Sequence, residues 1–383
     1  MKKYPPFLEV VPACQNYLWG KEGSHSAVWP FIQDDSKDDA KPYAEAWFGT
    51  HKSGMSRVLT EAGPVPLAEY LGKSISPLVK VLSIAEPLSI QLHPSAADAR
   101  PLHESDPISF PDPLAKTEAG IALSPVEMLC GLISDEDFLK LLPFLPMPFE
   151  NFSIGERPTK NIAYTCLLRT LKLPESELKI VLEKLAKSIG AKDVKMLSKR
   201  DSWVLEMLHR YPNGDRGILS FYFLNFIELS PGQSMFIPVG VPHAYLSGDL
   251  VEIMVPSDNV IRGGLTPKAV NLKLLSRCLD ASANSVIVEP SNHHGVSSYS
   301  YPENLFQLSR VGHNQGLEFD AKTQKLLLFV NAKSKFNWAL HDDSDEGSLE
   351  ISGCKALLIP KGSASYCVAV SEGEIFVITY PRS

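Results

Sequence analysis

The stretch GQSMFIPVGVPH, residues 232–243, decides the fold. An apolar run that reads as a strand leads into Pro238 and Gly240, and proline and glycine placed in this way close a tight turn between two strands. The turn ends at His243, where a second apolar run begins. Short apolar runs between turn residues continue on both sides, which favours a β-barrel or a β-sandwich.

The spacing Gly-x5-Pro-x-Gly-x2-His resembles the second sequence signature of the cupin barrels. The asparagine that customarily stands four residues after the histidine is absent, because Ser247 occupies that position. The resemblance implies that His243 points into a barrel. Residues 353–365 repeat the pattern with one extra residue and with Ser365 in place of the histidine. We interpret this echo as a second barrel that kept the turn and lost the metal.

The middle of the chain has a helical pattern. In SELKIVLEKLAKSIG (176–190), apolar residues recur at i, i+3, i+4, i+7 and i+11, the spacing of one helix face. Gly190 is expected to cap the end of this helix. SWVLEMLHRYP (202–212) predicts a second helix, with Ser202 as its N-cap and Pro212 as its stop.

These blocks predict a mainly β fold, with two cupin-type (jelly-roll) barrels and an α-helical insertion. A length of 383 residues agrees with two or three domains. Residues 1–133 together with 217–284 are expected to form the catalytic barrel. Residues 134–216 are expected to form the helical insertion, and residues 285–383 the metal-free barrel.

Composition limits the possible partners. The formal net charge of −7 argues against a surface that binds nucleic acid or an anionic membrane. The chain shows neither the apolar run of a secretory signal near its start nor a stretch long enough to span a membrane. Its six cysteines are scattered without a Cys-x-x-Cys pair, as in a reduced compartment. We therefore expect a soluble, cytoplasmic and monomeric protein that acts on a small molecule.

Four side chains predict a metal site. Gln91 and His93 end a β-type run, and residues two apart on a strand project from the same face. His243 would meet them from the barrel turn. Glu118, in the segment KTE, is the candidate carboxylate. Two imidazoles, a carboxylate and an amide oxygen make a plausible four-ligand zinc site, although glutamine is an unusual ligand. Outside this set, His51 and His103 stay open as pocket residues.

Longer motifs resemble the type I mannose-6-phosphate isomerases. The similarity runs in order over most of the chain and is weaker in the helical insertion and the tail. The motifs that carry it are NYLWG (16–20), YAEAWFGTH (43–51), LSIQLHP (88–94), TEAGIALSPVEMLCGL (117–132) and VPHAYLSGDLVEIMVPSDNVIRGGLTPK (241–268).

The resemblance implies one zinc ion held by a Gln and a His of the Q-x-H-P strand, a Glu of a K-x-E segment and the His of P-H-A-Y. These positions are Gln91, His93, Glu118 and His243. The chain departs from the family where Asp-Lys usually follows Q-x-H-P, because residues 95–96 are Ser-Ala. No departure removes a metal ligand.

The resemblance also implies an activity, the interconversion of mannose 6-phosphate and fructose 6-phosphate through a cis-enediol. That intermediate carries negative charge on O1 and O2, which a metal ion or a guanidinium stabilises. Arg262 is the leading electrostatic candidate because arginine stays charged. Lys116, Glu252 and Lys268 are alternative proton carriers, among which the sequence does not choose.

The phosphate group of the substrate needs cations and hydroxyls at one end of the pocket. Lys80, in the apolar run PLVKVLSI, is one candidate. Ser89, two residues before Gln91, is the other. Both also fit the positions at which the family binds the phosphate end.

Two other functions remain open. His93, Glu118 and His243 are also the two histidines and one carboxylate of a non-haem iron oxygenase. Against this, iron cupins usually space their first ligands as H-x-H or H-x-D/E. The second alternative is a non-catalytic sugar-binding or storage cupin, since cupin barrels can lose their metal.

Overall fold

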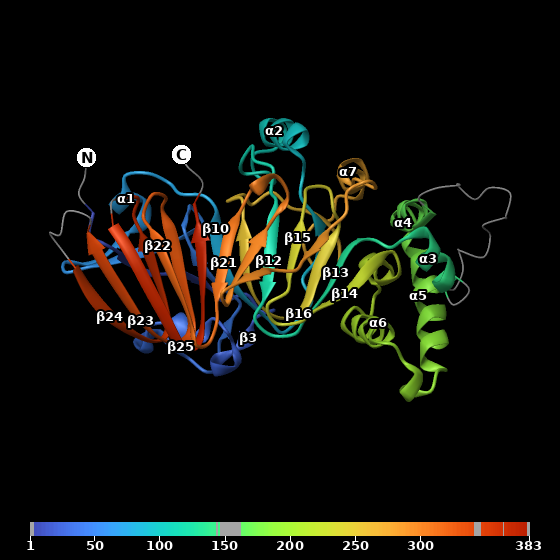
Figure 1. The fold of residues 1–383 in the computed structure, drawn as a ribbon. Helices are drawn as coiled ribbons and strands as arrows, with labels where there is room; N and C mark the ends of the chain where they lie inside the picture. Colours follow the sequence, from blue (N-terminus) through green and yellow to red (C-terminus); the bar gives the residue numbers. More distant parts are fainter. Residues whose placement is uncertain (1–3, 143–144, 146–161, 341–345, 363, 381–383) are drawn as a thin grey trace.

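The computed structural model describes residues 4–142, 145, 162–340, 346–362 and 364–380. Two large β-sheets stand side by side, and most helices gather at the end of the molecule remote from the C-terminal strands (Figure 1). The mainly β fold with two cupin-type barrels and a helical part, expected from the sequence, is confirmed. None of the helices in the described ranges is long and apolar enough to cross a membrane.

The first barrel is built on an eleven-stranded sheet whose main order is β18-β15-β12-β16-β10-β5-β2, with β11, β13, β14 and β17 attached at its side. The strands are β2 (Ala13–Gln15), β5 (Glu45–Phe48), β10 (Leu78–Ile84), β11 (Ile90–Leu92), β12 (Glu118–Ala122), β13 (Val126–Leu132), β14 (Leu224–Leu229), β15 (Ser234–Ile237), β16 (His243–Met254), β17 (Ile261–Gly264) and β18 (Val286–Val288).

One long strand, β16, pairs with strands on both sides of this barrel. Its second half, residues 248–254, pairs with β10 and β12, whereas residues 243–247 pair with β11 and β13. The pairing partners change at Gly248, whose φ of 113° is readily adopted only by glycine. A Cβ on Gly248 would lie 2.5 Å from the Pro125 carbonyl oxygen, so glycine also allows the close approach of β13. This bend brings both ends of β16 onto one interior.

The second barrel is built on a ten-stranded sheet in the order β19-β20-β21-β25-β23-β24-β1-β8-β9, with β22 on β25. Its strands are β1 (Leu8–Val11), β8 (Arg57–Thr60), β9 (Gly63–Pro66), β19 (Ser291–His293), β20 (Val296–Ser300), β21 (Gln307–Val311), β22 (Gln315–Asp320), β23 (Lys325–Leu340), β24 (Glu346–Ile359) and β25 (Ala364–Thr379). Two small two-stranded sheets, β3–β4 (Lys21–Glu22 and Pro42–Tyr43) and β6–β7 (Thr50–His51 and Gly54–Met55), lie outside both large sheets.

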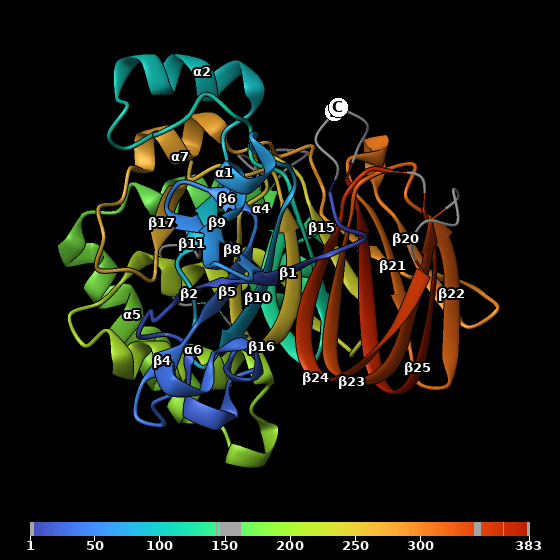
Figure 2. The ribbon, with the colours of Figure 1, turned by 90° about the vertical axis from the view of Figure 1, so that its left-hand side faces the viewer.

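Strand pairing crosses the domain boundaries expected from the sequence at two places. β1 joins the C-terminal sheet, where Leu8 pairs with Leu358 (Figure 2). β18 belongs to the stretch assigned to the second barrel, yet Val288 pairs with Ser234 of the first. Such exchanged strands cover edges that would otherwise be unpaired. The three-part division of the chain stays a proposal.

A shared hydrophobic core joins the two sheets. On β10, Val79 and Val81 pack toward the second sheet, while Lys80 between them points to the opposite face. Leu328 and Phe376 of the second sheet belong to the same cluster and are fully buried. The outward face of the first barrel therefore packs directly against the second sheet.

The echo of the barrel turn in the tail does not place its serine as expected. Ser365 is exposed on β25, whereas the neighbouring Tyr366 is buried and stacks with Phe319 and Phe336. A shift of one residue along a strand exchanges the two faces of a sheet. Because the echo carries one extra residue, Ser365 does not take the inward position that His243 has in the first barrel.

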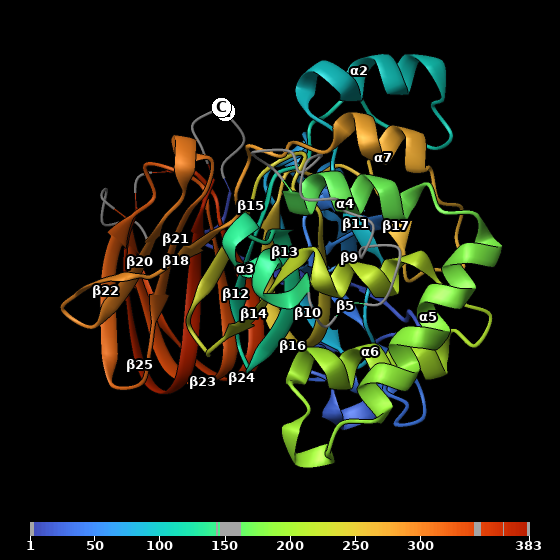
Figure 3. The ribbon, with the colours of Figure 1, turned by 90° about the vertical axis from the view of Figure 1, so that its right-hand side faces the viewer.

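Helices cover one side of the first barrel (Figure 3). They are α3 (Asp135–Leu141), α4 (Ile162–Leu171), α5 (Glu175–Gly190) and α6 (Lys199–Arg210), while α1 (Leu67–Leu71), α2 (Ala96–Ser105) and α7 (Leu272–Cys278) lie elsewhere. The insertion expected over 134–216 is helical where it is described; residues 143–144 and 146–161 lie outside the described residues.

The apolar face predicted for 176–190 is confirmed, because all five of its periodic residues are buried in α5. Both predicted caps are wrong. Gly190 is the last residue of α5, and Ala191 follows in the right-handed conformation, so the helix ends without a left-handed glycine. α6 begins four residues earlier than expected, because Ser198 is its N-cap and forms a capping box with Asp201. Ser202 lies inside the helix.

Candidate metal centre

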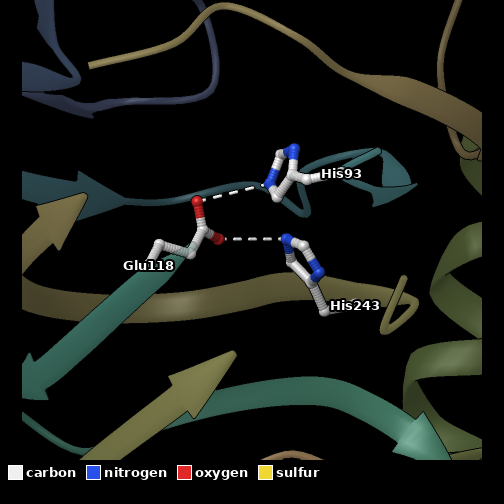
Figure 4. Close-up of side chains that lie close together, drawn as sticks. All are labelled: His93, Glu118 and His243. Carbon is white, nitrogen blue, oxygen red and sulfur yellow. Dashed lines mark ion pairs between the residues drawn. The ribbon is translucent and has the colours of Figure 1, made fainter. Parts of the chain in front are cut away.

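His93, Glu118 and His243 converge in the interior of the first barrel. The Glu118 carboxylate lies between the two imidazoles, with Oε2 3.3 Å from His93 Nε2 and Oε1 3.1 Å from His243 Nε2 (Figure 4). The three side chains are almost completely buried, and their ligand atoms lie within 4.8 Å of one another. This is the set of residues expected from the sequence, apart from Gln91.

The barrel turn brings two of these residues together. Gly240 adopts a left-handed backbone, with φ of 75°, and its N–H donates a hydrogen bond of 2.9 Å to the His93 carbonyl oxygen. A Cβ at Gly240 would lie 2.9 Å from the Cβ of Asp280, so the position also lacks room for a side chain. Three residues later β16 begins at His243, which pairs with Gln91 of β11. Gly240 therefore holds the segment that carries His93 next to the segment that carries His243.

Both imidazoles are held by backbone carbonyls at Nδ1. His93 Nδ1 lies 2.8 Å from the Asn259 oxygen, and His243 Nδ1 lies 2.9 Å from the Val241 oxygen. An imidazole that donates from Nδ1 keeps an acceptor lone pair at Nε2, the atom facing Glu118. Carbonyl partners of this kind orient histidines that bind metals.

The atoms that face one another lack ordinary hydrogen bonds. His93 Nε2 is buried without a hydrogen-bond partner among the described residues, and Glu118 Oε2 has the Lys116 ammonium on one side, at 3.0 Å, and this bare nitrogen on the other. Leaving a buried nitrogen such as His93 Nε2 unpaired costs about 1–3 kcal/mol, and a divalent cation would bind this nitrogen and the carboxylate at once. Burial and the charge of Lys116 lower the pKa of His93 to about 4, which keeps its imidazole neutral. A neutral imidazole beside a carboxylate fits a metal ion.

Gln91 also reaches this group. Its amide nitrogen lies 3.4 Å from His243 Nε2, and rotation of the amide by half a turn exchanges nitrogen and oxygen. Gln91 is only partly buried, unlike the other three residues. The structure thus brings together the four residues expected as ligands, and ligation by them stays a prediction.

Lys116 is the cation next to the centre. Its ammonium lies 3.0 Å from Glu118 Oε2, and the side chain is buried. Burial alone would raise the pKa of Glu118, but the charge of the Lys116 ammonium outweighs burial and holds the pKa well below its ordinary value. Glu118 is therefore a carboxylate.

A second buried charge group lies on the same interior. The Lys80 ammonium lies 3.4 Å from Glu252 and 3.5 Å from Glu45, and 4.5 Å from the centre of the Trp47 ring. Burial lowers the pKa of Lys80, but the charges of the two carboxylates outweigh burial and raise it. Burial raises the pKa of Glu252. Lys80 is thus an ammonium whose charge two carboxylates already share.

Three other predicted residues differ in exposure. Arg262 is half-buried on β17 directly opposite Gln91, so both side chains project from one face. Burial lowers the pKa of Arg262. Ser89 is half-buried just before β11, and Lys268 is exposed in the turn after β17. Among the described residues, neither Ser89 nor Lys268 forms a hydrogen bond or ion pair with the interior group.

Glu45 and Asp258 are polar residues near the centre that received no role from the sequence. Trp47 Nε1 donates to Glu45, beside Lys80. Asp258 lies 3.6 Å from Nε2 of the buried His51 and accepts a hydrogen bond from Ser53. The signal for Glu45 is its place in β5, a strand whose four residues are all buried. A buried carboxylate there requires a partner.

Comparison with known proteins places the chain in a family. Residues 7–133 match the model of the phosphomannose isomerase type I catalytic domain. Mannose-6-phosphate isomerase of Homo sapiens is 35% identical over 309 residues, which cover 71% of this chain and 73% of the human protein. The chain belongs to the mannose-6-phosphate isomerase family. A probable mannose-6-phosphate isomerase of Dictyostelium discoideum is 33% identical over 418 residues, covering 96% of this chain and 91% of that protein.

Solved structures of phosphomannose isomerases share the fold. A variant of the Salmonella typhimurium phosphomannose isomerase superposes with a TM-score of 0.82 at 21% identity, covering 98% of this chain and all of that one. A mannose 6-phosphate isomerase with zinc bound gives a TM-score of 0.81 at 22% identity, covering 99% and 100%. The resemblance seen in the sequence is therefore confirmed, and the similarity extends through the tail.

Proposed function

We propose that this protein interconverts mannose 6-phosphate and fructose 6-phosphate in a zinc-dependent reaction. The observation that carries the proposal is the buried group of His93, Glu118 and His243, with Gln91 beside it, in a chain of this family. In the reaction a proton leaves C2 of the aldose and a proton is added at C1, while the hydroxyl proton moves from O2 to O1. The intermediate is a cis-enediol.

Gln91, His93, Glu118 and His243 would hold the zinc ion. Bound there, zinc supplies positive charge beside the sugar oxygens on which negative charge develops. The neutral imidazole of His93 and the ionised Glu118 are already in the protonation states that ligation needs.

Arg262 is proposed to stabilise the same negative charge. Its position opposite Gln91 directs the guanidinium to the face of the sheet that carries the amide ligand. A guanidinium keeps its charge even where burial lowers its pKa. Arg262 would act on the enediol without binding the metal.

For proton transfer we propose Lys116 or Glu252 ahead of Lys268. Lys116 and Glu252 are both buried on the barrel interior, whereas Lys268 lies in an exposed turn. Burial raises the pKa of Glu252, which makes its carboxylate a better proton acceptor than an exposed one.

For the phosphate group we propose Lys80 and Ser89. The charge of Lys80 is already shared with Glu45 and Glu252, so its attraction for a phosphate is partly offset. Ser89 offers a half-buried hydroxyl two residues before Gln91. We further propose that the enzyme is a cytoplasmic monomer that binds neither nucleic acid nor membranes, and that its product enters GDP-mannose biosynthesis.

The test is isomerisation of mannose 6-phosphate before and after chelation, followed by addition of zinc. We expect activity to disappear with the metal and to return with zinc. Activity that survives complete removal of metal would contradict the proposal. Bound iron with substrate-dependent oxygen uptake would favour the oxygenase instead, and an inactive protein that carries zinc and binds sugar would favour a non-catalytic cupin.

A further inference from the structure

Asn259 contacts the metal centre and the segment that leads to it. The residue lies between β16 and β17 and is fully buried. Its backbone oxygen accepts the hydrogen bond from His93 Nδ1 at 2.8 Å. Its side-chain Nδ2 donates to the carbonyl oxygens of Asp112 and Leu114, at 2.8 and 2.9 Å, and lies 3.2 Å from Asp112 Oδ1.

The segment that Asn259 holds runs directly into Glu118. Residues 111–117 belong to no helix or strand, so their path depends on bonds to neighbouring elements. Besides the amide of Asn259, the Asp258 N–H donates to Asp112 Oδ2 at 3.0 Å, and the Val255 N–H donates to the Thr117 oxygen at 3.0 Å. These bonds determine where β12 begins and hence where Glu118 projects.

The side-chain amide of Asn259 acts as a donor only. Its Oδ1 is buried without a hydrogen-bond partner among the described residues. Burying an oxygen without a hydrogen bond lowers the stability of the folded protein. Oδ1 therefore does not explain why an asparagine stands at this position. The bonds from Nδ2 are therefore the contribution of this side chain.

We infer that Asn259 is a positioning residue for the metal centre, acting through His93 and Glu118. Its carbonyl keeps the His93 imidazole in the tautomer whose Nε2 faces Glu118. Its amide fixes the segment before Glu118, so that the two ligands keep their separation. The inference rests on the metal-binding part of the proposed function and is independent of the sugar reaction.

Asn259→Asp tests the inference without a change in side-chain size. A carboxylate cannot donate, and it would face two carbonyl oxygens and the carboxylate of Asp112. Cobalt(II), added to the chelator-treated full-length protein, serves as the probe through its visible absorption. We expect the variant to bind cobalt about 10–100-fold more weakly and with a shifted spectrum.

Val368→Ala is the matched control, because it removes buried apolar volume from the second barrel at a distance from the centre. It should lose stability yet bind cobalt as the unmodified protein does. Equal cobalt affinity in Asn259→Asp and the unmodified protein, or an equal loss in Val368→Ala, would overturn the inference alone. Failure of the unmodified protein to bind cobalt would overturn the proposed function as well.

Asp112→Ala provides a second variant if Asn259→Asp does not fold. Asp112 is only partly buried, and its removal loosens the same segment from the other side. Its cobalt affinity should fall in the same direction, and an unchanged affinity would contradict the inference.

Discussion

The two oxygens of Glu118 have different partners. Oε1 faces His243 alone, whereas Oε2 faces His93 and the Lys116 ammonium. Lys116 balances the buried carboxylate and competes with any cation for Oε2. Substituting a ligand residue should therefore reduce metal content, whereas substituting a residue that stabilises charge should reduce turnover.

His243→Ala should lose the metal and the activity together. The substitution removes an imidazole that is completely buried and already held in the ligating tautomer. Metal content after gel filtration, measured by atomic emission, checks the result. The control is His209→Ala, an exposed histidine of α6, which should retain its metal. Full zinc content in His243→Ala would remove His243 from the ligand set.

Arg262→Ala should keep the metal and lose turnover. Removing one group that stabilises developing charge typically lowers kcat by about 10²–10³. Zinc content and kcat measured on the same preparation separate the two effects, and Arg277→Ala on the exposed face of α7 is the control. Loss of zinc in Arg262→Ala would mean that the residue supports the site rather than the reaction.

At this scale, the sequence predicts what local geometry determines. The proximity of Gln91 and His93 follows from alternation along a strand, and the inward His243 follows from the turn before it. The partners of Lys80 could not be predicted, because Glu45 reaches it only through the pairing of β5 with β10, which no spacing encodes. The carbonyl of Asn259 is invisible for the same reason.

At the level of elements, the ends of helices were harder to predict from the sequence than their buried faces. The periodicity of α5 was sufficient to predict its buried face, whereas the start of α6 depended on a choice between two serines. Ser198 is the cap because Asp201, three residues on, completes the capping box and also binds Lys192 at 2.8 Å. Ser202 has no acidic residue three positions later.

Asp201→Asn should destabilise the protein by about 1 kcal/mol at neutral pH. Burial alone would raise the pKa of Asp201, but hydrogen bonds from Lys192 and Ser198 outweigh it and lower the pKa. The folded state thus holds its charge at a lower pH than the unfolded state, whose Asp pKa is about 3.9. The stabilisation is present above that value and is lost as pH falls through the lowered folded pKa.

Urea unfolding at several pH values checks this prediction. The difference between Asp201→Asn and the unmodified protein should shrink below about pH 4. Glu206→Gln, an exposed change of equal charge in the same helix, should have little effect at any pH. A difference that is independent of pH would show that the charge of Asp201 is not what stabilises α6.

At the scale of the molecule, the two barrels share one core. The cluster between them contains Val79 and Val251 from the first sheet and Leu326 and Phe376 from the second. The sequence predicted two barrels but not their interface, because an apolar strand face looks the same whether it lines a barrel or packs on a neighbour. The halves should therefore unfold together.

Phe376→Ala should lower the stability of both halves at once. Truncating a fully buried phenylalanine typically costs about 3–5 kcal/mol. Calorimetry should show one transition shifted to lower temperature, with loss of metal at the same temperature. Two separate transitions, of which only one moves, would show that the barrels fold independently.

The place of β1 has a consequence for synthesis. Leu8 pairs with Leu358 near the other end of the chain. At a translation rate of about 5–20 residues per second, the ribosome needs about 20–70 s between the two residues. During that time one edge of β1 has no partner and its apolar residues are uncovered. β1 thus leaves the ribosome long before β24, and its pairing is completed only when that later strand has been made.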